Sequence, residues 1–99
     1  LARGLGDVYK RQILSKQLLR SGTSIGANVK EAIRGQSKDD FIHKLNISLK
    51  EASESEYWIE LLFETDYITK QQFDSLIGDC RELIKLLTSI IKTSRKEGK

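Results

Sequence analysis

The feature that most constrains the fold is the spacing of apolar residues in the last third of the chain. From Lys70 to Ser94 they recur in a near-unbroken i, i+3, i+4, i+7 series: Phe73, Leu76, Ile77, Cys80, Leu83, Ile84, Leu87, Ile90 and Ile91. This spacing is typical of one face of an α-helix. The chain contains no proline that would stop or kink such a helix. We therefore expect a helix over about 70–94, with an apolar arc of roughly 140° that is wider than a two-sided seam uses.

A second helix is expected over about 38–64. Ser37 is its predicted N-cap, and two acidic residues follow in the first turn, where they complement the helix dipole. Its apolar stripe, roughly 100° wide, consists of Phe41, Ile42, Leu45, Leu49, Ala52, Ile59 and Phe63. After a break at 65–68, Thr69 and Gln72 have the spacing of a capping box that starts the third helix.

The first helix is expected over about 12–34, with Gly35 as its C-terminal cap, and it has three distinct faces. The apolar side consists of Leu14, Leu18, Ile25, Val29 and Ala32. The opposite, basic side carries Lys16, Arg20, Lys30 and Arg34. Between them lies a polar edge formed by Gln17, Ser21, Ser24 and Asn28. A helix sorted in this way is typical of a binding module, with one face for a partner and one for a core.

Short connections make neighbouring helices antiparallel, so the predicted fold is all-α: an up-and-down helical bundle of three long helices. The bundle domain is expected over residues 13–96, followed by the basic tail end 97–99. Residues 1–12 have no amphipathic period, contain glycines that weaken a helix, and resemble translated adapter sequence. We therefore treat 1–12 as a non-native segment and leave it out of the functional argument.

Composition favours one small globular domain of 99 residues, with 38% hydrophobic residues. A single cysteine excludes an internal disulfide framework. No apolar run is long enough for a membrane span, and no signal peptide is visible, so the expected location is the cytoplasm. Charge is unevenly distributed: residues 1–38 carry net +6, residues 39–91 net −6 and residues 92–99 net +3. Such asymmetry suits nucleic-acid contact and head-to-tail association of copies equally well.

From about Ile13 to Lys96 the chain resembles the four-helix-bundle proteins encoded in intervening sequences of bacterial 23S ribosomal RNA genes. Residues 20–32 resemble the family's Arg-x-x-x-Ser-Ile-x-x-Asn-x-x-Glu-Ala segment, and residues 35–42 its turn into the next helix. Residues 49–56 resemble its Leu-x-x-Ala/Leu-x-Glu-x-Glu segment, and residues 65–69 its last turn. None of these segments is a catalytic signature.

The resemblance implies a left-handed antiparallel bundle that assembles as a homopentameric ring. A related branch, the accessory proteins of diversity-generating retroelements, implies contact with a partner protein and with nucleic acid. The family begins with an additional long helix that this sequence lacks. Three helices are then an incomplete version of four, and the uncovered groove would expose apolar surface that favours association.

The candidate nucleic-acid-binding residues are the basic side of the first helix and the basic residues near the C-terminus. They are Lys16, Arg20, Lys30, Arg34, Lys92, Arg95 and Lys96, with Lys99 in the same tail. Such a row can follow RNA or DNA phosphates, while a solvated face or a salt-bridge face between subunits explains the same pattern. Aromatic residues do not alternate with these cations, so base stacking is not supported.

Two further candidate sites are structural. Glu56 falls on the core stripe of the second helix and needs a polar partner, which Asn28, Ser24 or Arg20 could supply. Ile47, Trp58 and Leu61 form a second apolar patch, either for the missing helix or for another subunit.

Nothing in the sequence predicts catalysis, a metal site or a cofactor. His43 has no partner at metal-ligand spacing, and Cys80 is expected to be a small buried residue. Gly22 and Gly26 have a Gly-x-x-x-Gly spacing, which we interpret as a close approach of helices in a soluble chain. Two hypotheses remain open: a non-enzymatic oligomeric module that binds nucleic acid, and a protein–protein scaffold ring that does not. Steep salt dependence of binding distinguishes the first from the second.

Overall fold

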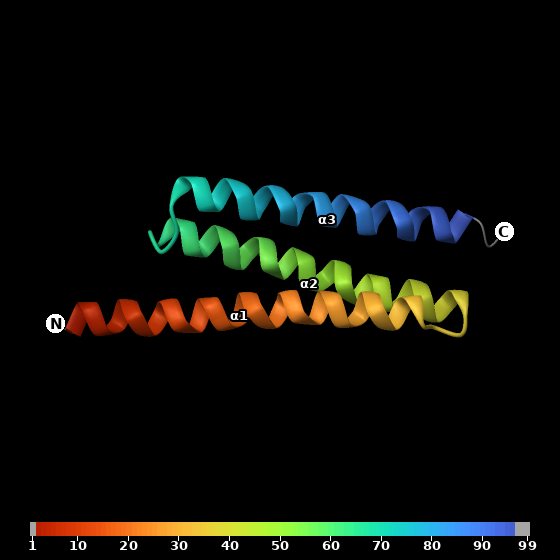
Figure 1. Ribbon diagram of the computed structural model, residues 1–99, viewed down its shortest axis with the longest axis horizontal. Helices are drawn as coiled ribbons and strands as arrows, with labels where there is room; N and C mark the ends of the chain where they lie inside the picture. The colour runs from red at the N-terminus through yellow and green to blue at the C-terminus, as the bar shows by residue number, and fades with distance from the viewer. Residues whose placement is uncertain (1, 97–99) are drawn as a thin grey trace.

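The computed structural model describes the backbone of residues 2–96 and the side chains of residues 8–96. Three α-helices, α1 (Ala2–Ile33), α2 (Lys38–Glu64) and α3 (Lys70–Lys96), run antiparallel to their neighbours in an elongated molecule of 61 × 22 × 14 Å (Figure 1). Residues 2–96 contain no strand. The prediction of an all-α, up-and-down helical architecture is confirmed. None of the described helices is long and apolar enough to cross a membrane.

The caps of α2 and α3 follow the predicted chemistry. The Ser37 Oγ accepts a hydrogen bond from the Asp40 backbone N–H at 3.1 Å, which satisfies one of the free donors of the first turn of α2. At the start of α3, the Gln72 N–H donates to the Thr69 Oγ1 at 3.1 Å, and the Thr69 N–H donates to the Gln72 Oε1 at 2.9 Å. These reciprocal bonds form a capping box and fix the beginning of the helix.

The two turns differ in how they are made. After α2, Asp66 adopts a left-handed backbone (φ 62°), and the next N–H, that of Tyr67, donates to the Leu62 carbonyl at 2.9 Å. Gly35 follows α1 as predicted, but it does not have the positive φ of a left-handed cap. Its lack of a side chain serves a close approach instead, because a Cβ there would lie 2.7 Å from the Asp40 Oδ2 and 3.1 Å from the Ala32 carbonyl oxygen.

The beginning of α1 differs from the prediction. The helix starts at Ala2 and continues without a break through Gly4 and Gly6, about ten residues before the expected start. A glycine costs a helix only about 1 kcal/mol, and contacts elsewhere can outweigh it. One such contact is a cation–π interaction, in which the Arg11 guanidinium lies over the Tyr67 ring, 4.9 Å from its centroid. The first helix is thereby joined to the turn between α2 and α3.

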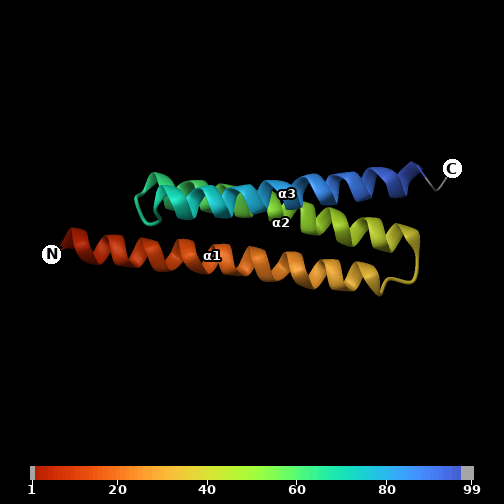
Figure 2. The same cartoon turned by 45° about the horizontal axis from the view of Figure 1, so that its top comes forward.

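α2 is the central helix and contacts both others, whereas no Cα atom of α1 lies within 8 Å of one of α3 (Figures 1 and 2). The apolar stripes of α1 and α3 therefore both pack against α2. One cluster of buried residues joins all three helices toward the α1–α2 turn, with Ile25, Leu45 and Leu87 among its members. A second cluster, around Ile59, Ile77 and Cys80, lies toward the α2–α3 turn.

Small polar residues share the interior with these apolar clusters. Ser21 and Ser48 are completely buried, and Ser55 is nearly so. The Ser48 Oγ donates across the interface to the Ile25 carbonyl at 3.1 Å. Small side chains at these positions let α1 and α2 approach closely, which the apolar stripe of the sequence does not show.

Candidate nucleic-acid interface and open groove

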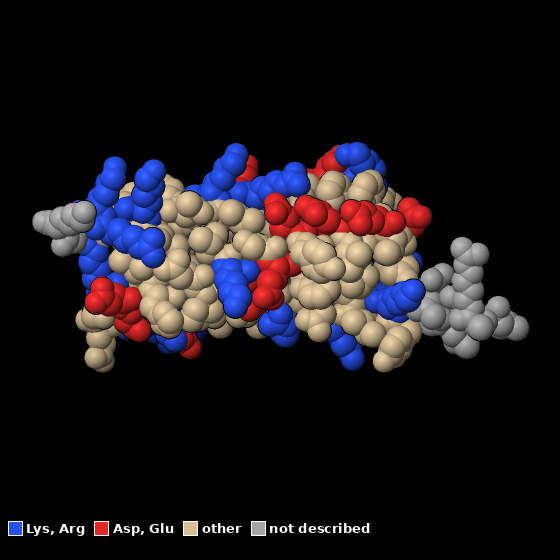
Figure 3. Space-filling view, turned by 180° about the vertical axis from the view of Figure 1, so that it is seen from behind, with Lys and Arg blue, Asp and Glu red and all other residues tan. Residues whose placement is uncertain are grey.

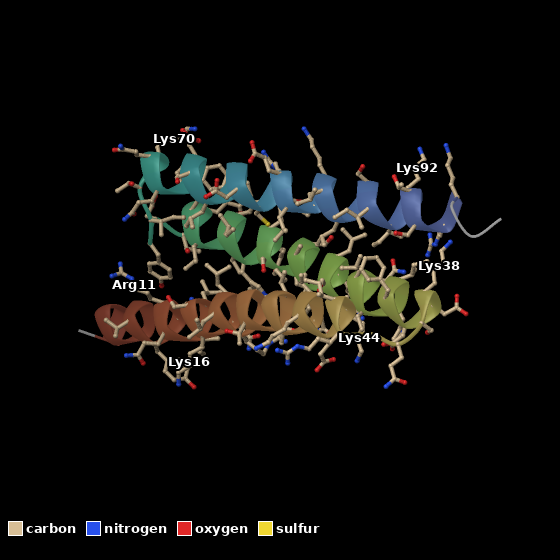
Figure 4. All side chains as sticks on the ribbon, turned by 45° about the vertical axis from the view of Figure 1, so that its right-hand side comes forward. Arg11, Lys16, Lys38, Lys44, Lys70 and Lys92 are labelled. Carbon is tan, nitrogen blue, oxygen red and sulfur yellow. The ribbon has the colours of Figure 1, made fainter. Side chains whose placement is uncertain are left out.

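The predicted basic side of α1 is interrupted at Arg20, whereas Lys16, Lys30 and Arg34 are exposed. The Arg20 guanidinium forms ion pairs with α2, at 3.1 Å from the Glu54 carboxylate and 3.4 Å from that of Glu51. The positive charge of Arg20 is therefore paired with two carboxylates of α2. Lys16 is exposed and lies in the half of the molecule far from the α1–α2 turn (Figure 4).

Basic residues of α2, of α3 and of the turn after α1 lie at one end of the bundle. α1 and α3 both finish there, and α2 begins there, so chain topology brings together residues from distant parts of the sequence (Figure 1). We call this surface the basic end; it consists of Arg34, Lys38, Lys92, Arg95 and Lys96. All five side chains are exposed, and none forms an ion pair within residues 8–96.

Figure 3 shows the charge separation on the face opposite that of Figure 1. Lys and Arg side chains gather at the end that holds the α1–α2 turn, and Asp and Glu side chains form a row toward the other end. Asp39 and Asp40 lie at the basic end as well, which leaves its net charge at +3 with both counted. Lys38 and Lys92 lie at this same end, away from Lys16 and Lys70 (Figure 4). Lys30, one turn before Arg34, is also exposed.

Other cations are engaged within the protein. Lys44 lies 2.9 Å from the Glu31 carboxylate, and this contact raises the pKa of the Lys44 amine. Lys70 forms an i, i+4 pair with Asp74 on α3. Like Arg20, these two lysines are paired with acidic residues of the protein, which the sequence alone does not show.

The predicted partner of Glu56 is wrong. Its carboxylate accepts a hydrogen bond from the Arg81 Nε of α3 at 3.0 Å, and the Arg81 Nη2 lies 3.6 Å from Glu60. Glu56 is one turn beyond Ala52, whose carbonyl accepts from the Cys80 thiol of α3. Its side chain therefore faces α3 rather than α1, and it is half-exposed. Glu56 therefore belongs to a surface ion pair and not to a buried polar core.

Asn28 is likewise not joined to Glu56. Its amide nitrogen donates to the backbone carbonyl of Ser24 at 2.9 Å and lies 3.3 Å from the Ser24 hydroxyl oxygen. Both groups belong to α1, one turn apart. The predicted polar core of Asn28 and Glu56 is therefore replaced by one local contact and one ion pair between α2 and α3.

Ile47, Trp58 and Leu61 are half-buried on α2. Leu61 lines a hollow together with Lys10, Ile13 and Leu14, so its neighbour is the first half of α1. The Trp58 Nε1–H is buried and has no acceptor among the described residues. The use of this patch as an interface between subunits stays a prediction.

An open groove runs between α1 and α3 with α2 as its floor. It has a volume of about 730 Å³ and is mostly apolar, with Leu18, Leu19, Ile59, Leu62, Leu76 and Leu83 among its lining residues. Leu19 is 72% exposed, which is unusual for a leucine beside a core. The predicted close helix approach at Gly22 and Gly26 is absent: a Cβ at either position would meet nothing within 4 Å. Gly22 lines the groove instead.

Cys80 and His43 lie where the sequence places them. Cys80 is buried in the second core cluster, and burial raises the pKa of its thiol, with the Glu56 carboxylate adding to the rise and Arg81 opposing it. A protonated, buried thiol is a poor nucleophile. His43 is exposed on α2.

Sequence reasoning missed Lys38 and the α2–α3 hollow. Lys38 is the first residue of α2, directly after the Ser37 cap, and it shares no helical face with the basic residues of α1 or α3. The hollow, about 500 Å³ in volume, lies beside the basic end and is lined by Asn46, Leu49, Thr88, Ile91, Lys92, Arg95 and Lys96. Only the pairing of α2 with α3 brings these residues together. Lys99 lies outside the described residues.

Comparisons with known proteins agree with this architecture. The family described as 23S rRNA-intervening sequence protein matches residues 6–89. The chain is also similar to a protein of unknown function from the S23 ribosomal protein family of Bacteroides thetaiotaomicron, known from a crystal structure. The two are 62% identical, with a TM-score of 0.79, over 81% of this chain and 71% of that one. No curated protein matches. With most of its length matched, the chain belongs to the family of 23S rRNA-intervening sequence proteins.

Proposed function

We propose that this protein is a non-enzymatic helical module that associates with RNA through its basic end. The observation that carries the proposal is the convergence at one end of the molecule of five exposed cations, from α2, α3 and the turn after α1, that form no ion pair within residues 8–96. Phosphates are spaced along a nucleic-acid backbone, and a set of such cations can contact several of them. Membership in a family named for rRNA intervening sequences supports RNA as the nucleic acid.

Basic residues at helix C-termini also stabilise a helix by complementing its dipole. Arg95 and Lys96 in the last turn of α3 have this second use. It does not explain Lys38, which stands at a helix N-terminus where a positive charge is unfavourable. The surface therefore has more positive charge than helix stability requires.

The test is the salt dependence of RNA affinity, measured by fluorescence anisotropy with a labelled RNA hairpin. The variant Lys92→Gln/Arg95→Gln/Lys96→Gln removes three cations from the basic end. Each lost phosphate contact lowers the slope of log affinity against log salt by about 0.7–0.9, so we expect the slope to fall by about 2. The matched control, Lys10→Gln/Lys16→Gln/Lys70→Gln, has the same net charge. Lys16 and Lys70 lie in the opposite half of the molecule (Figure 4), and Lys10 precedes Lys16 on α1.

An unchanged slope in the control, with a reduced slope in the first variant, is the expected result. Equal losses in both variants would mean that affinity follows net charge and that no localised surface exists. A larger decrease of the slope in the control than in the first variant would favour binding through the other half of the molecule, which includes Lys16 of the basic side of α1. Absence of salt-dependent binding by the unmodified protein would overturn the proposal.

The open groove favours a second candidate, a homo-oligomeric scaffold in which a second copy covers this apolar surface. Exposed Leu19 and Leu76 would be buried by such a contact, and the glycines at 22 and 26 leave room for a close helix. A ring of five copies is the specific form that we propose.

Light scattering after size exclusion tests this candidate. We expect a discrete oligomer for the unmodified chain and dissociation for Leu19→Lys/Leu76→Lys, since each lysine places a charge in the apolar contact. Tyr57→Lys, which changes an exposed residue outside the groove lining, is the control and should leave the oligomer intact. A monomer at all concentrations would exclude the scaffold, and a discrete oligomer of another size would exclude the ring of five.

A further inference from the structure

We propose that the α2–α3 hollow binds an unpaired nucleotide of an RNA strand, with the base in the hollow and the flanking phosphates on the basic end. The inference rests on the proposed function, because the three cations Lys92, Arg95 and Lys96 belong to both surfaces. It adds a site for a base, which a row of phosphate contacts does not provide.

The volume and the apolar floor of the hollow suit a small ligand. Its volume of about 500 Å³ lies within the usual range of ligand sites. Leu49 and Ile91 form an apolar floor, and Ile91 is almost completely buried. An apolar floor of this kind suits the flat face of a base, which loses water when it is covered.

Polar groups are placed at the edge of this floor. The Asn46 side chain has no hydrogen bond within residues 8–96, so its amide donors and its acceptor are available to the polar edge of a base. Thr88 uses its hydroxyl within α3, where it donates to the Ile84 carbonyl at 2.7 Å. Asn46 is therefore the residue most suited to select among bases.

The charge of the lining is one-sided. Lys92, Arg95 and Lys96 provide three cations, and within residues 8–96 no acidic residue lines the hollow. The Arg95 guanidinium is planar and can stack on a base, a use for which no aromatic residue is present in the lining. This combination of apolar floor, free amide and cationic rim matches a nucleotide better than an uncharged apolar ligand.

A base paired within a duplex cannot enter a hollow between two helices. The site therefore predicts a preference for RNA with an unpaired nucleotide over fully paired RNA. Stacking of the Arg95 guanidinium on a base adds enough free energy for a preference of roughly two- to thirty-fold.

The experiment compares two labelled RNA hairpins, one blunt and one with an unpaired tail, by fluorescence anisotropy at several salt concentrations. We expect the full 99-residue chain to prefer the tailed hairpin. Asn46→Leu/Thr88→Leu fills the hollow without changing any charge, and it should abolish the preference while leaving the salt slope unchanged. Thr93→Leu, an exposed threonine of α3 outside the lining, is the matched control and should retain it.

Two failures are distinguishable. If the unmodified protein binds both hairpins equally and with steep salt dependence, the proposed function stands and this inference is wrong. If it binds neither hairpin at low salt, the proposed function itself fails. Retention of the preference in the filled variant, shown to be folded by circular dichroism, would also overturn the inference.

Discussion

The close contact between α1 and α2 at Ser48 leads to a prediction about stability. No surface of Ser48 is exposed, and its hydroxyl donates to the Ile25 carbonyl at 3.1 Å. Ser48→Ala removes this bond without widening the interface, so it should lower the free energy of unfolding by about 1 kcal/mol. Ser48→Leu removes the same bond and adds a larger branched side chain to a filled space, which costs about 1–3 kcal/mol more. The expected total is about 2–4 kcal/mol.

The assay is urea denaturation followed by far-ultraviolet circular dichroism. Ser53→Leu is the matched control, because Ser53 lies on the same helix, is exposed, and bonds only to the Leu49 carbonyl of its own helix. We expect this control to change the free energy of unfolding by less than about 0.5 kcal/mol. Equal losses for Ser48→Leu and Ser53→Leu would refute the close approach of α1 and α2 at this position.

Three other perturbations test the core, the surface ion pairs and the buried thiol. Leu87→Ala should lower the free energy of unfolding by about 2–5 kcal/mol and its exposed neighbour Leu86→Ala by less than about 0.5 kcal/mol, and comparable urea midpoints for the two would contradict the core assignment. Arg81→Gln should lower the free energy of unfolding by less than about 1 kcal/mol, because the ion pair of Arg81 with Glu56 is half-exposed. A coupling energy above about 1 kcal/mol in a double-mutant cycle with Glu56→Gln would contradict this. Burial raises the pKa of Cys80, so its contribution to stability is complete below the pKa of the unfolded thiol and is lost as pH rises through the folded one. Urea midpoints from pH ~8 to ~10 should therefore fall more for the unmodified protein than for Cys80→Ala, and parallel curves would argue against a buried thiol.

Local signals predicted the helix boundaries where side chains act within one turn of the chain. Ser37 caps α2 and Thr69 pairs with Gln72 because each of these contacts spans three residues, a distance that sequence spacing reports directly. The start of α1 was missed for the opposite reason. Arg11 lies over the Tyr67 ring, 56 residues further along the chain, and no local pattern contains a contact of that kind.

The candidate site was predictable in its residue types and not in its arrangement. Helical periodicity shows which side chains share a face, but it does not show which neighbour covers that face. Arg20 and Lys16 share a predicted face, yet α2 pairs Arg20 with two carboxylates and leaves Lys16 exposed. Glu56 shares a stripe with core residues, yet its partner comes from α3.

Antiparallel topology explains why the charge that remains gathers at one end. An up-and-down chain of three helices places the end of the first, the start of the second and the end of the third together. Basic residues at the two C-terminal ends are favoured by the helix dipoles, so helix stability and phosphate binding select the same residue types there. Helix stability does not explain Lys38, because a positive charge at a helix N-terminus is unfavourable. It also does not explain the open apolar floor of the hollow beside Lys92. For this reason, salt-dependent RNA affinity that falls when the basic end is changed, and not the number of basic residues, is the decisive evidence for a binding function.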